Sequence, residues 1–372
     1  MPANRSSGSW QTGLVCTAAI LVVIGLYCSQ QAFQITAHAG RRHTGDAQTP
    51  VAITPSTSPQ TAKNNAQGQE ASIATTSTSP PPNPVQVLRD HAGLYRDKTA
   101  HIEFKEVVLL TAANFAYLDF LANWECYAER LGLDWVAIAL DPQAYAKLDP
   151  TRTLQASGET SAVSMEFRSK TFNIMALNSL TSVLNVMKLG FDVVFSDTDN
   201  VFLSDPFRAG ISLGDLIREQ KYDYIYQLNW PGPRPYTRGQ EIDEGNTGFY
   251  YASLRRKPKS MNRLWEATLQ EALRHQHLDG QTNFWNALKA LRKAVLPCFR
   301  ICQQDRNCSL QEDSTLDYCE MDPFLHRTGW GKRDDVGPVS YHANFKVGRE
   351  SKISAMINMG VWTQGQASCK PA

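Results

Sequence analysis

The sequence predicts an α/β domain in which a mixed sheet is flanked by helices, and two kinds of segment support this fold class. Short, continuous apolar runs at 107–112 and 135–140 have the form of strands that are buried on both faces of a sheet, and 191–196 is a further predicted strand. Apolar residues at helical spacing predict helices over 115–132 and 170–189, which end near Gly132 and Gly190. Because strands and helices alternate, we expect βαβ units packed as one layered domain.

The segment before this domain predicts a membrane anchor. Residues 13–28 are almost wholly apolar, and no Lys, Arg, Asp or Glu lies between Arg5 and Arg41. Sixteen residues are fewer than the roughly 20 that span a bilayer, so we extend the predicted span to 13–33 and assign 1–12 to a cytoplasmic tail. A cleaved signal peptide is the alternative, since Ala37-His38-Ala39 has the form of a cleavage site. Both interpretations place the remainder in the secretory lumen.

Residues 34–86 are rich in Ser, Thr, Pro, Ala and Gln, which is typical of a disordered stalk because such a segment buries little apolar surface. The folded, lumenal catalytic domain is therefore expected at 87–372. Within it, a polar stretch at 298–319 carries Cys298, Cys302, Cys308 and Cys319. These spacings lack the paired Cys-x2-Cys motifs of a zinc site. We therefore expect an insertion braced by disulfides, with a zinc site as the alternative.

The chemistry concentrates where the apolar run 191–196 leads into Asp197-Thr198-Asp199. Ligands bind beyond the carboxyl ends of strands in open α/β sheets, and paired carboxylates suit Mn²⁺ or Mg²⁺ together with phosphate oxygens. An Asp-x-Asp sequence also occurs in ordinary surface turns, but the preceding strand favours a metal site. The chain has a net charge of only +1 and no long basic run, so nucleic acid is not an expected partner.

Four segments, in order, resemble the nucleotide-diphospho-sugar transferases of glycosyltransferase family seventy-seven, which includes plant pectin (rhamnogalacturonan) xylosyltransferases and extensin arabinosyltransferases. They are 107–141, 190–207 with its GFDVVFSDTDNVFLSDPF sequence, 245–254 and 341–362. The resemblance implies a GT-A fold. It also implies a single-pass type II protein of the Golgi membrane, with the catalytic domain in the lumen.

The resemblance further implies a role for each matching residue. Asp197, Asp199 and His342 would hold the metal. The nucleotide-sugar contacts would be Thr111, Ala112, Asp197 and Lys352, and the residues nearest the reacting groups would be Asn246, Asp279 and Gln281. The chain departs from the family pattern at Gly280, where the family has Asp before the Gln, so Asp279 substitutes only with a one-residue shift.

The implied reaction is metal-dependent transfer of xylose, arabinose or galactose from a UDP-sugar, with retention at the anomeric carbon. The acceptor would be a glycan or a hydroxyproline-rich glycoprotein. Retention requires a covalent intermediate or same-face attack. We favour same-face attack because Asp243 and Glu244 are candidate nucleophiles by position alone. The alternatives are a catalytically inactive homologue that binds nucleotide or glycan, and a nucleotidyltransferase, which the anchor and stalk disfavour.

Overall fold

The computed structural model describes residues 82–158, 160–229, 245–294, 298–301, 315–329 and 337–363. The expected tail, anchor and most of the stalk, with Asp243, Glu244, Cys302 and Cys308, lie outside these ranges. Among the residues that the structure does describe, no helix is long and apolar enough to cross a bilayer.

An eight-stranded mixed sheet forms the centre of the domain, in the order β3-β2-β1-β4-β7-β6-β9-β8. Only β7 runs antiparallel to its neighbours, β4 and β6, and the other pairs are parallel. The strands of this sheet are β1 (Val107–Ala113), β2 (Val136–Ala139), β3 (Thr153–Gln155), β4 (Asp192–Ser196), β6 (Tyr224–Leu228), β7 (Gly245–Ala252), β8 (Cys298–Ile301) and β9 (Thr315–Glu320).

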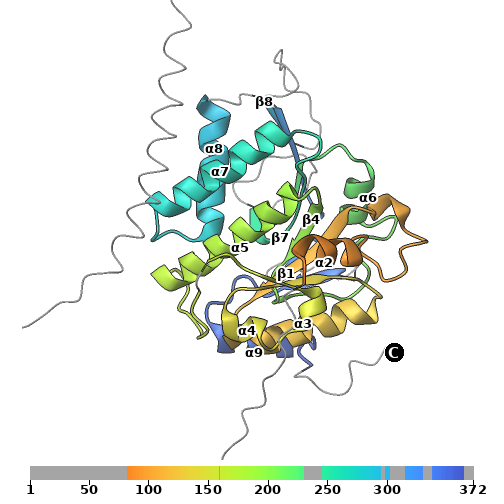
Figure 1. Ribbon diagram of the computed structural model, residues 1–372, viewed down its shortest axis with the longest axis vertical. Helices are drawn as coiled ribbons and strands as arrows, with labels where there is room; N and C mark the ends of the chain where they lie inside the picture. Colours follow the sequence, from red (N-terminus) through yellow and green to blue (C-terminus); the bar gives the residue numbers. More distant parts are fainter. Residues whose placement is uncertain are drawn as a thin grey trace, which may run out of the picture. The chain divides into compact units, whose positions relative to one another are not determined.

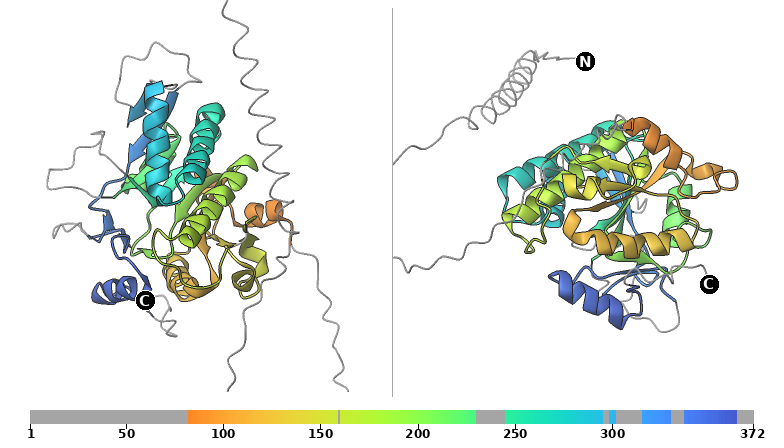
Figure 2. Two further views of the ribbon diagram at one scale, coloured as in Figure 1. Left: turned by 90° about the vertical axis from the view of Figure 1, so that its left-hand side faces the viewer. Right: turned by 60° about the horizontal axis from the view of Figure 1, so that its bottom comes forward.

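Helices cover both faces of this sheet (Figures 1 and 2). The α-helices are α2 (Pro84–His91), α3 (Leu118–Arg130), α4 (Pro142–Tyr145), α5 (Lys170–Lys188), α6 (Ser212–Arg218), α7 (Pro258–Arg274), α8 (Gly280–Ala294) and α9 (Arg349–Asn358). Short 3-10 helices lie at Ile102–Phe104, Phe115–Tyr117 and Pro150–Arg152.

The alternation of side chains along each strand divides the core into two layers. Val108 and Leu110 of β1 pack with residues of α2, α5, α7 and α8, whereas Leu109, between them, packs with α3 and α6. Both layers are almost fully buried, which explains why these strands read as continuous apolar runs rather than alternating ones. The predicted α/β architecture, a mixed sheet flanked by helices, is confirmed.

A smaller sheet lies against α3 and completes the site region. It consists of β5 (Asn200–Phe202), β10 (His326–Thr328) and β11 (Ser340–His342), in the order β10-β11-β5. A third apolar cluster joins Phe120 of α3, Val201 of β5, Tyr341 of β11 and Met356 of α9. The C-terminal segment is thereby packed onto the first βαβ unit, with α9 outside α3 in the right-hand view of Figure 2.

The element boundaries differ from the predicted ones at a few ends. α2 begins at Pro84, before the boundary expected at residue 87, because the Asn83 side chain caps it and Pro84 suits its first turn. The helix expected over 115–132 begins with a 3-10 turn and continues as α3 from Leu118. Cys126 and Cys319 are each disulfide-bonded. The disulfide-braced insertion expected at 298–319 stays a prediction, because Cys302 and Cys308 lie outside the described residues.

Candidate functional site

Three side chains from distant parts of the chain converge at the carboxyl end of β4. Asp197 and Asp199 follow β4 directly, and His342 is the last residue of β11, opposite Asn200 of β5. The ligand atoms that these residues offer all lie within 4.8 Å of one another. His342 Nε2 is 3.3 Å from Asp199 Oδ1 and 3.9 Å from Asp197 Oδ2. Two carboxylates and an imidazole at this spacing can coordinate one divalent cation.

The orientation of the His342 ring is set by Gln227 in β6. Gln227 Nε2 donates to the His326 carbonyl oxygen at 3.1 Å, so its Oε1 faces His342 Nδ1 at 2.8 Å. That contact requires Nδ1 to carry the proton, which leaves the Nε2 lone pair directed at the carboxylates. Burial lowers the pKa of His326 to about 3, so the ring behind this network stays neutral.

Gly248 of β7 provides the space for the site. A Cβ atom at this position would lie 2.2 Å from Asp197 Oδ2 and 2.8 Å from His342 Cε1. The Gly248 carbonyl oxygen also accepts a hydrogen bond from the Asp197 amide at 2.6 Å. Only glycine allows a strand backbone to approach the two ligands this closely.

Lys352 of α9 is the cation nearest to the carboxylates, and its Nζ donates to Asp199 Oδ2 at 2.5 Å. Although burial opposes ionisation of Asp199, the Lys352 ammonium and His342 lower its pKa. The pKa of Asp197 is instead raised to about 6, by desolvation in the crevice and by the Asp199 charge beside it. The site therefore holds one carboxylate that is always ionised and a second that a cation would ionise.

The carboxyl end of β1 lies next to this cluster, since β1 pairs with β4. Thr111 is fully buried there, and its Oγ1 has no hydrogen-bond partner. Asn114 is 1% exposed, and its Nδ2 donates to two carbonyl oxygens of the 161–163 segment, while its Oδ1 has no partner. Ala112, between them, is partly buried. Both unpaired oxygens lie beneath the surface at the edge where α/β sheets bind ligands, so a ligand would reach them only after a local shift.

Asn246 holds the backbone of β7 in place. Its Oδ1 accepts from the Gly248 amide at 2.6 Å, and its Nδ2 donates to Asn229 Oδ1 at 3.4 Å. Asn344, two residues after His342, donates to the same Asn229 oxygen at 3.0 Å. This Asn network ties the start of β7 to the segment that carries His342.

The remaining two predicted residues lie at the start of α8. Asp279 caps the helix by accepting from the Thr282 amide at 2.9 Å, and it pairs with Arg168 at 2.8 Å. Gln281 is half-buried, one turn before Trp285, whose Nε1 donates to the Gly245 carbonyl oxygen at 2.7 Å. This contact places Gln281 near the beginning of β7.

Sequence reasoning overlooked Gln227 and Asn114. The available signals were weak: Gln227 is a polar residue inside an otherwise apolar strand, and Asn114 follows the first strand directly. The structure also places Gly248 against the metal-ligand candidates.

Comparison with known proteins agrees with this geometry. The family described as nucleotide-diphospho-sugar transferase matches residues 133–356. The β-arabinofuranosyltransferase RAY1 of Arabidopsis thaliana is 24% identical over 277 residues, which cover 68% of this chain and 47% of that protein. The chain thus spans about half the length of this curated relative.

Solved structures of glycosyltransferases also align, at low similarity. GlyE of Streptococcus pneumoniae aligns with a TM-score of 0.39 and 11% identity, over 70% of this chain and 60% of that one. A glycosyltransferase that glycosylates the major capsid of PBCV-1 aligns with a TM-score of 0.39 and 11% identity, over 68% of this chain and 98% of that one. Scores at this level carry no argument beyond the architecture already described.

Proposed function

The chain belongs to the nucleotide-diphospho-sugar transferase family, and from that premise we propose that it transfers a sugar from a UDP-sugar to a glycan or hydroxyproline-rich glycoprotein in the Golgi lumen. The observation that carries this proposal is the cluster of Asp197, Asp199 and His342, whose ligand atoms lie within 4.8 Å of one another at the carboxyl end of β4. The arabinofuranosyltransferase relative favours a pentose donor, arabinose before xylose, with galactose as the third candidate.

The residues present fit a divalent cation. Mn²⁺ or Mg²⁺ would find oxygen ligands from two carboxylates and a nitrogen ligand from an imidazole held in the metal-binding tautomer. Gly248 keeps the space beside these ligands open. When bound, the ion would neutralise charge on the departing diphosphate. Lys352, which balances Asp199 in the structure, is positioned to turn toward the same phosphates.

The protein residues position the donor rather than react with it. Thr111, Ala112 and Asn114 would contact the nucleotide after a local shift, because β1 ends beside the metal-ligand candidates and carries two unpaired oxygens. Gln281, Asp279 and Asn246 would face the sugar and the acceptor from the start of α8 and β7.

In the transfer step, the acceptor oxygen forms a bond to the anomeric carbon on the face from which the diphosphate leaves. The bond from that carbon to the phosphate oxygen breaks, and the acceptor proton passes to that oxygen. This route needs no protein nucleophile, and positioning with charge stabilisation supplies most of the barrier reduction.

The test is release of UDP from UDP-arabinofuranose, UDP-xylose and UDP-galactose by the full chain, with and without Mn²⁺. We expect one donor to be consumed, with loss of activity in EDTA and in Asp199→Ala. Because Asp199 is buried and pairs with Lys352, the substitution also leaves that ammonium without its partner, so a thermal melt must show that the variant is folded at the assay temperature. Full activity in EDTA, or in a folded Asp199→Ala protein, would overturn the metal assignment. A chain that binds UDP but consumes no donor would be an inactive homologue.

A further inference from the structure

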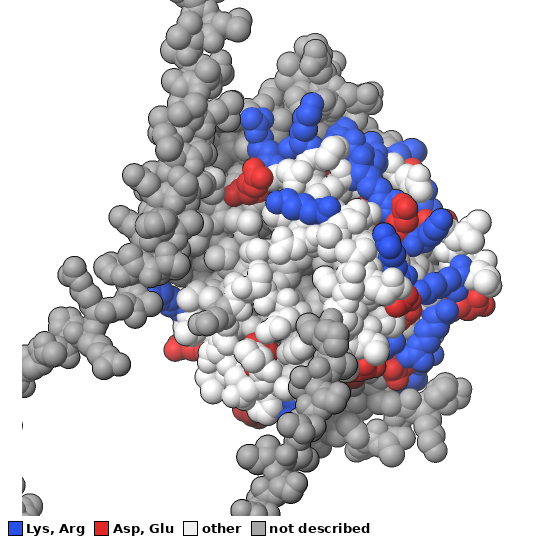
Figure 3. All heavy atoms as spheres, in the orientation of Figure 1, with Lys and Arg blue, Asp and Glu red and all other residues white. Residues whose placement is uncertain are grey.

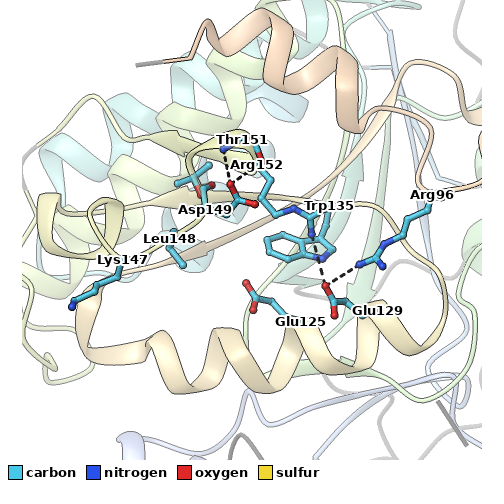
Figure 4. A pocket seen from close by; sticks show the side chains of 10 residues that line it. Arg96, Glu125, Glu129, Trp135, Lys147, Leu148, Asp149, Thr151 and Arg152 are labelled. Carbon is cyan, nitrogen blue, oxygen red and sulfur yellow. Dashed lines mark hydrogen bonds and ion pairs between the residues drawn. The ribbon is translucent and has the colours of Figure 1, made fainter. Parts of the chain in front are cut away.

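A second polar pocket lies away from the metal-ligand candidates (Figure 4). Its walls come from the second half of α3, from Trp135 before β2, and from the 147–153 segment that leads into β3, with Arg96 at one side. α3 starts at the edge of the sheet that carries the metal-ligand candidates, and Glu129 lies roughly 16 Å further along the helix at 1.5 Å per residue. The pocket is therefore distinct from the site described above.

Most charged groups of this pocket are held in place by each other. Arg152 lies over the Trp135 ring at 4.4 Å, and its guanidinium reaches Asp134 at 3.5 Å and Glu129 at 4.0 Å. Arg96 pairs with the same Glu129 at 2.8 Å. The pocket thus presents a rigid frame of planar polar groups, as the dashed contacts in Figure 4 show.

Three polar groups in this frame remain unpaired. The Trp135 side chain is almost fully buried, at 3% exposed, and its Nε1 has no hydrogen-bond partner. The Glu125 carboxyl is half-buried beside it without an ion pair, and burial, together with the Glu129 charge, raises its pKa to about 7. Lys147 is exposed at the mouth. The Glu125 carboxyl and the Lys147 ammonium can make hydrogen bonds that the protein itself does not use. Trp135 Nε1 lies beneath the surface, with Arg152 over the ring, so it is a reporter beside the pocket rather than an exposed donor.

The balance of charge decides which ligand suits the pocket. The pocket is lined by the cations Arg96, Lys147 and Arg152 and by the acids Glu129 and Asp149, while the Glu125 carboxyl is only partly ionised near pH 7. The pocket therefore carries a small net charge and offers no strong attraction to an ion of either sign. A metal is also disfavoured, since among the described residues only the Asp197 cluster has the spacing of metal ligands. A sugar hydroxyl both donates and accepts, so it suits the half-buried Glu125 carboxyl, which can also do both when it is protonated.

We propose that this pocket binds a neutral sugar unit of the glycan acceptor, at a distance from the unit that is modified. The inference rests on the proposed function for the identity of the ligand. A packed connection supports it: Trp135 contacts Trp124 edge-on at 5.8 Å, and Trp124 Nε1 donates to Ser196 Oγ at 3.1 Å, next to Asp197. One glycan chain could pass along α3 and reach both sites.

The uncharged surface over α5 offers no comparable site. Figure 3 shows few Lys, Arg, Asp or Glu side chains there, and α5 is charged only at Lys170 and Lys188. The pocket, which gathers charged and polar side chains around Trp135, is the better candidate for sugar binding.

The experiment measures the Trp135 indole N–H resonance by NMR, assigned with Trp135→Phe, while neutral arabino-, xylo- and galacto-oligosaccharides are added. It uses the full chain in an Asp199→Ala background without nucleotide, so that binding is measured without transfer. We expect a saturable shift with at least one neutral oligosaccharide. Glu125→Leu should weaken binding about tenfold, because a sugar hydroxyl then loses its partner.

Two further variants act as controls. Glu125→Gln should bind like the parent, since the amide matches the shape of the protonated carboxyl. Glu266→Leu makes the same change at an exposed residue of α7, across the sheet, and should have no effect. An acidic oligogalacturonide is added in a parallel titration. The proposal would be overturned by the absence of any shift, by a shift with the oligogalacturonide alone, or by unchanged binding in Glu125→Leu. Failure of the proposed transfer would appear separately, as absence of UDP release by the unmodified protein.

Discussion

Replacing Gly248 by Ala tests the geometry of the metal site more directly than removal of a ligand. The new methyl group would lie 2.2 Å from Asp197 Oδ2 and 2.8 Å from Asp197 Cγ and His342 Cε1. These separations are shorter than any real Cβ contact, so a neighbour must move. The backbone of β7 cannot move easily because it is paired to β4 and β6, and His342 is 1% exposed.

The Asp197 side chain moves most easily, but the buried His342 ring must shift as well, because the methyl group also clashes with its Cε1. Asp197 is 46% exposed, so it can rotate toward solvent at a cost of about 1 kcal/mol in rotamer energy. The metal would then lose one of its three protein ligands. Changes to groups that only orient a ligand already weaken metal binding 10- to 100-fold, so we expect Gly248→Ala to weaken Mn²⁺ binding about 100-fold or more, or roughly 2.7 kcal/mol.

The assay is a Mn²⁺ titration of UDP release, together with calorimetric titration of Mn²⁺ into protein with UDP, and a thermal melt. Gly337→Ala is the matched control, since a Cβ there meets nothing within 4 Å. We expect Gly248→Ala to melt within a few degrees of the parent while its metal midpoint shifts strongly, and Gly337→Ala to change neither. A Gly248→Ala protein with an unchanged metal midpoint would refute the assignment of Asp197 as a ligand.

Three further outcomes follow from the same contacts. Gln227→Met removes the acceptor for His342 Nδ1, so Mn²⁺ binding should weaken about tenfold with kcat recovered at saturating metal; an unchanged midpoint would exclude this role. His326 has a folded pKa near 3, below its ordinary 6.5, so its stabilising contribution is present above 6.5 and is lost as pH falls toward 3. The His326 contribution to the free energy of unfolding should fall by about 1.4 kcal/mol from about pH 7.5 to about pH 5.5. The readout is the difference between the parent and His326→Gln in urea titrations at each pH, because carboxyls with a raised pKa, such as Glu125, stabilise the fold over the same range. Asp279→Asn should keep the cap of α8, so its free energy of unfolding should lie within about 0.5 kcal/mol of the parent's. Loss of UDP release in that variant would then support a role of Asp279 near the sugar, and full activity would contradict it.

The sequence determined the layered core and one half of the site. The strands β1 and β2 are apolar apart from Thr111, and β4 has an apolar centre between Asp192 and Ser196, because helices cover both faces of the sheet. This pattern can be recognised from the sequence. Asp197 and Asp199 could be located in the same way, because they follow a buried strand and strand ends are where α/β sheets bind ligands.

Only the tertiary structure decided how the rest of the site is assembled. His342 was suspected by resemblance, but its distance to Asp199, its tautomer and its partner Gln227 depend on β5, β6 and β11, which are far apart in the sequence. Gly248 and Asn114 carry no local signal of their roles, since glycine and asparagine are common in turns. The second pocket is likewise a product of packing, because α3 and the segment before β3 bring Glu125 and Arg152 together around Trp135. Contacts of this kind depend on how helices and strands pack against each other, and local periodicity does not encode that packing.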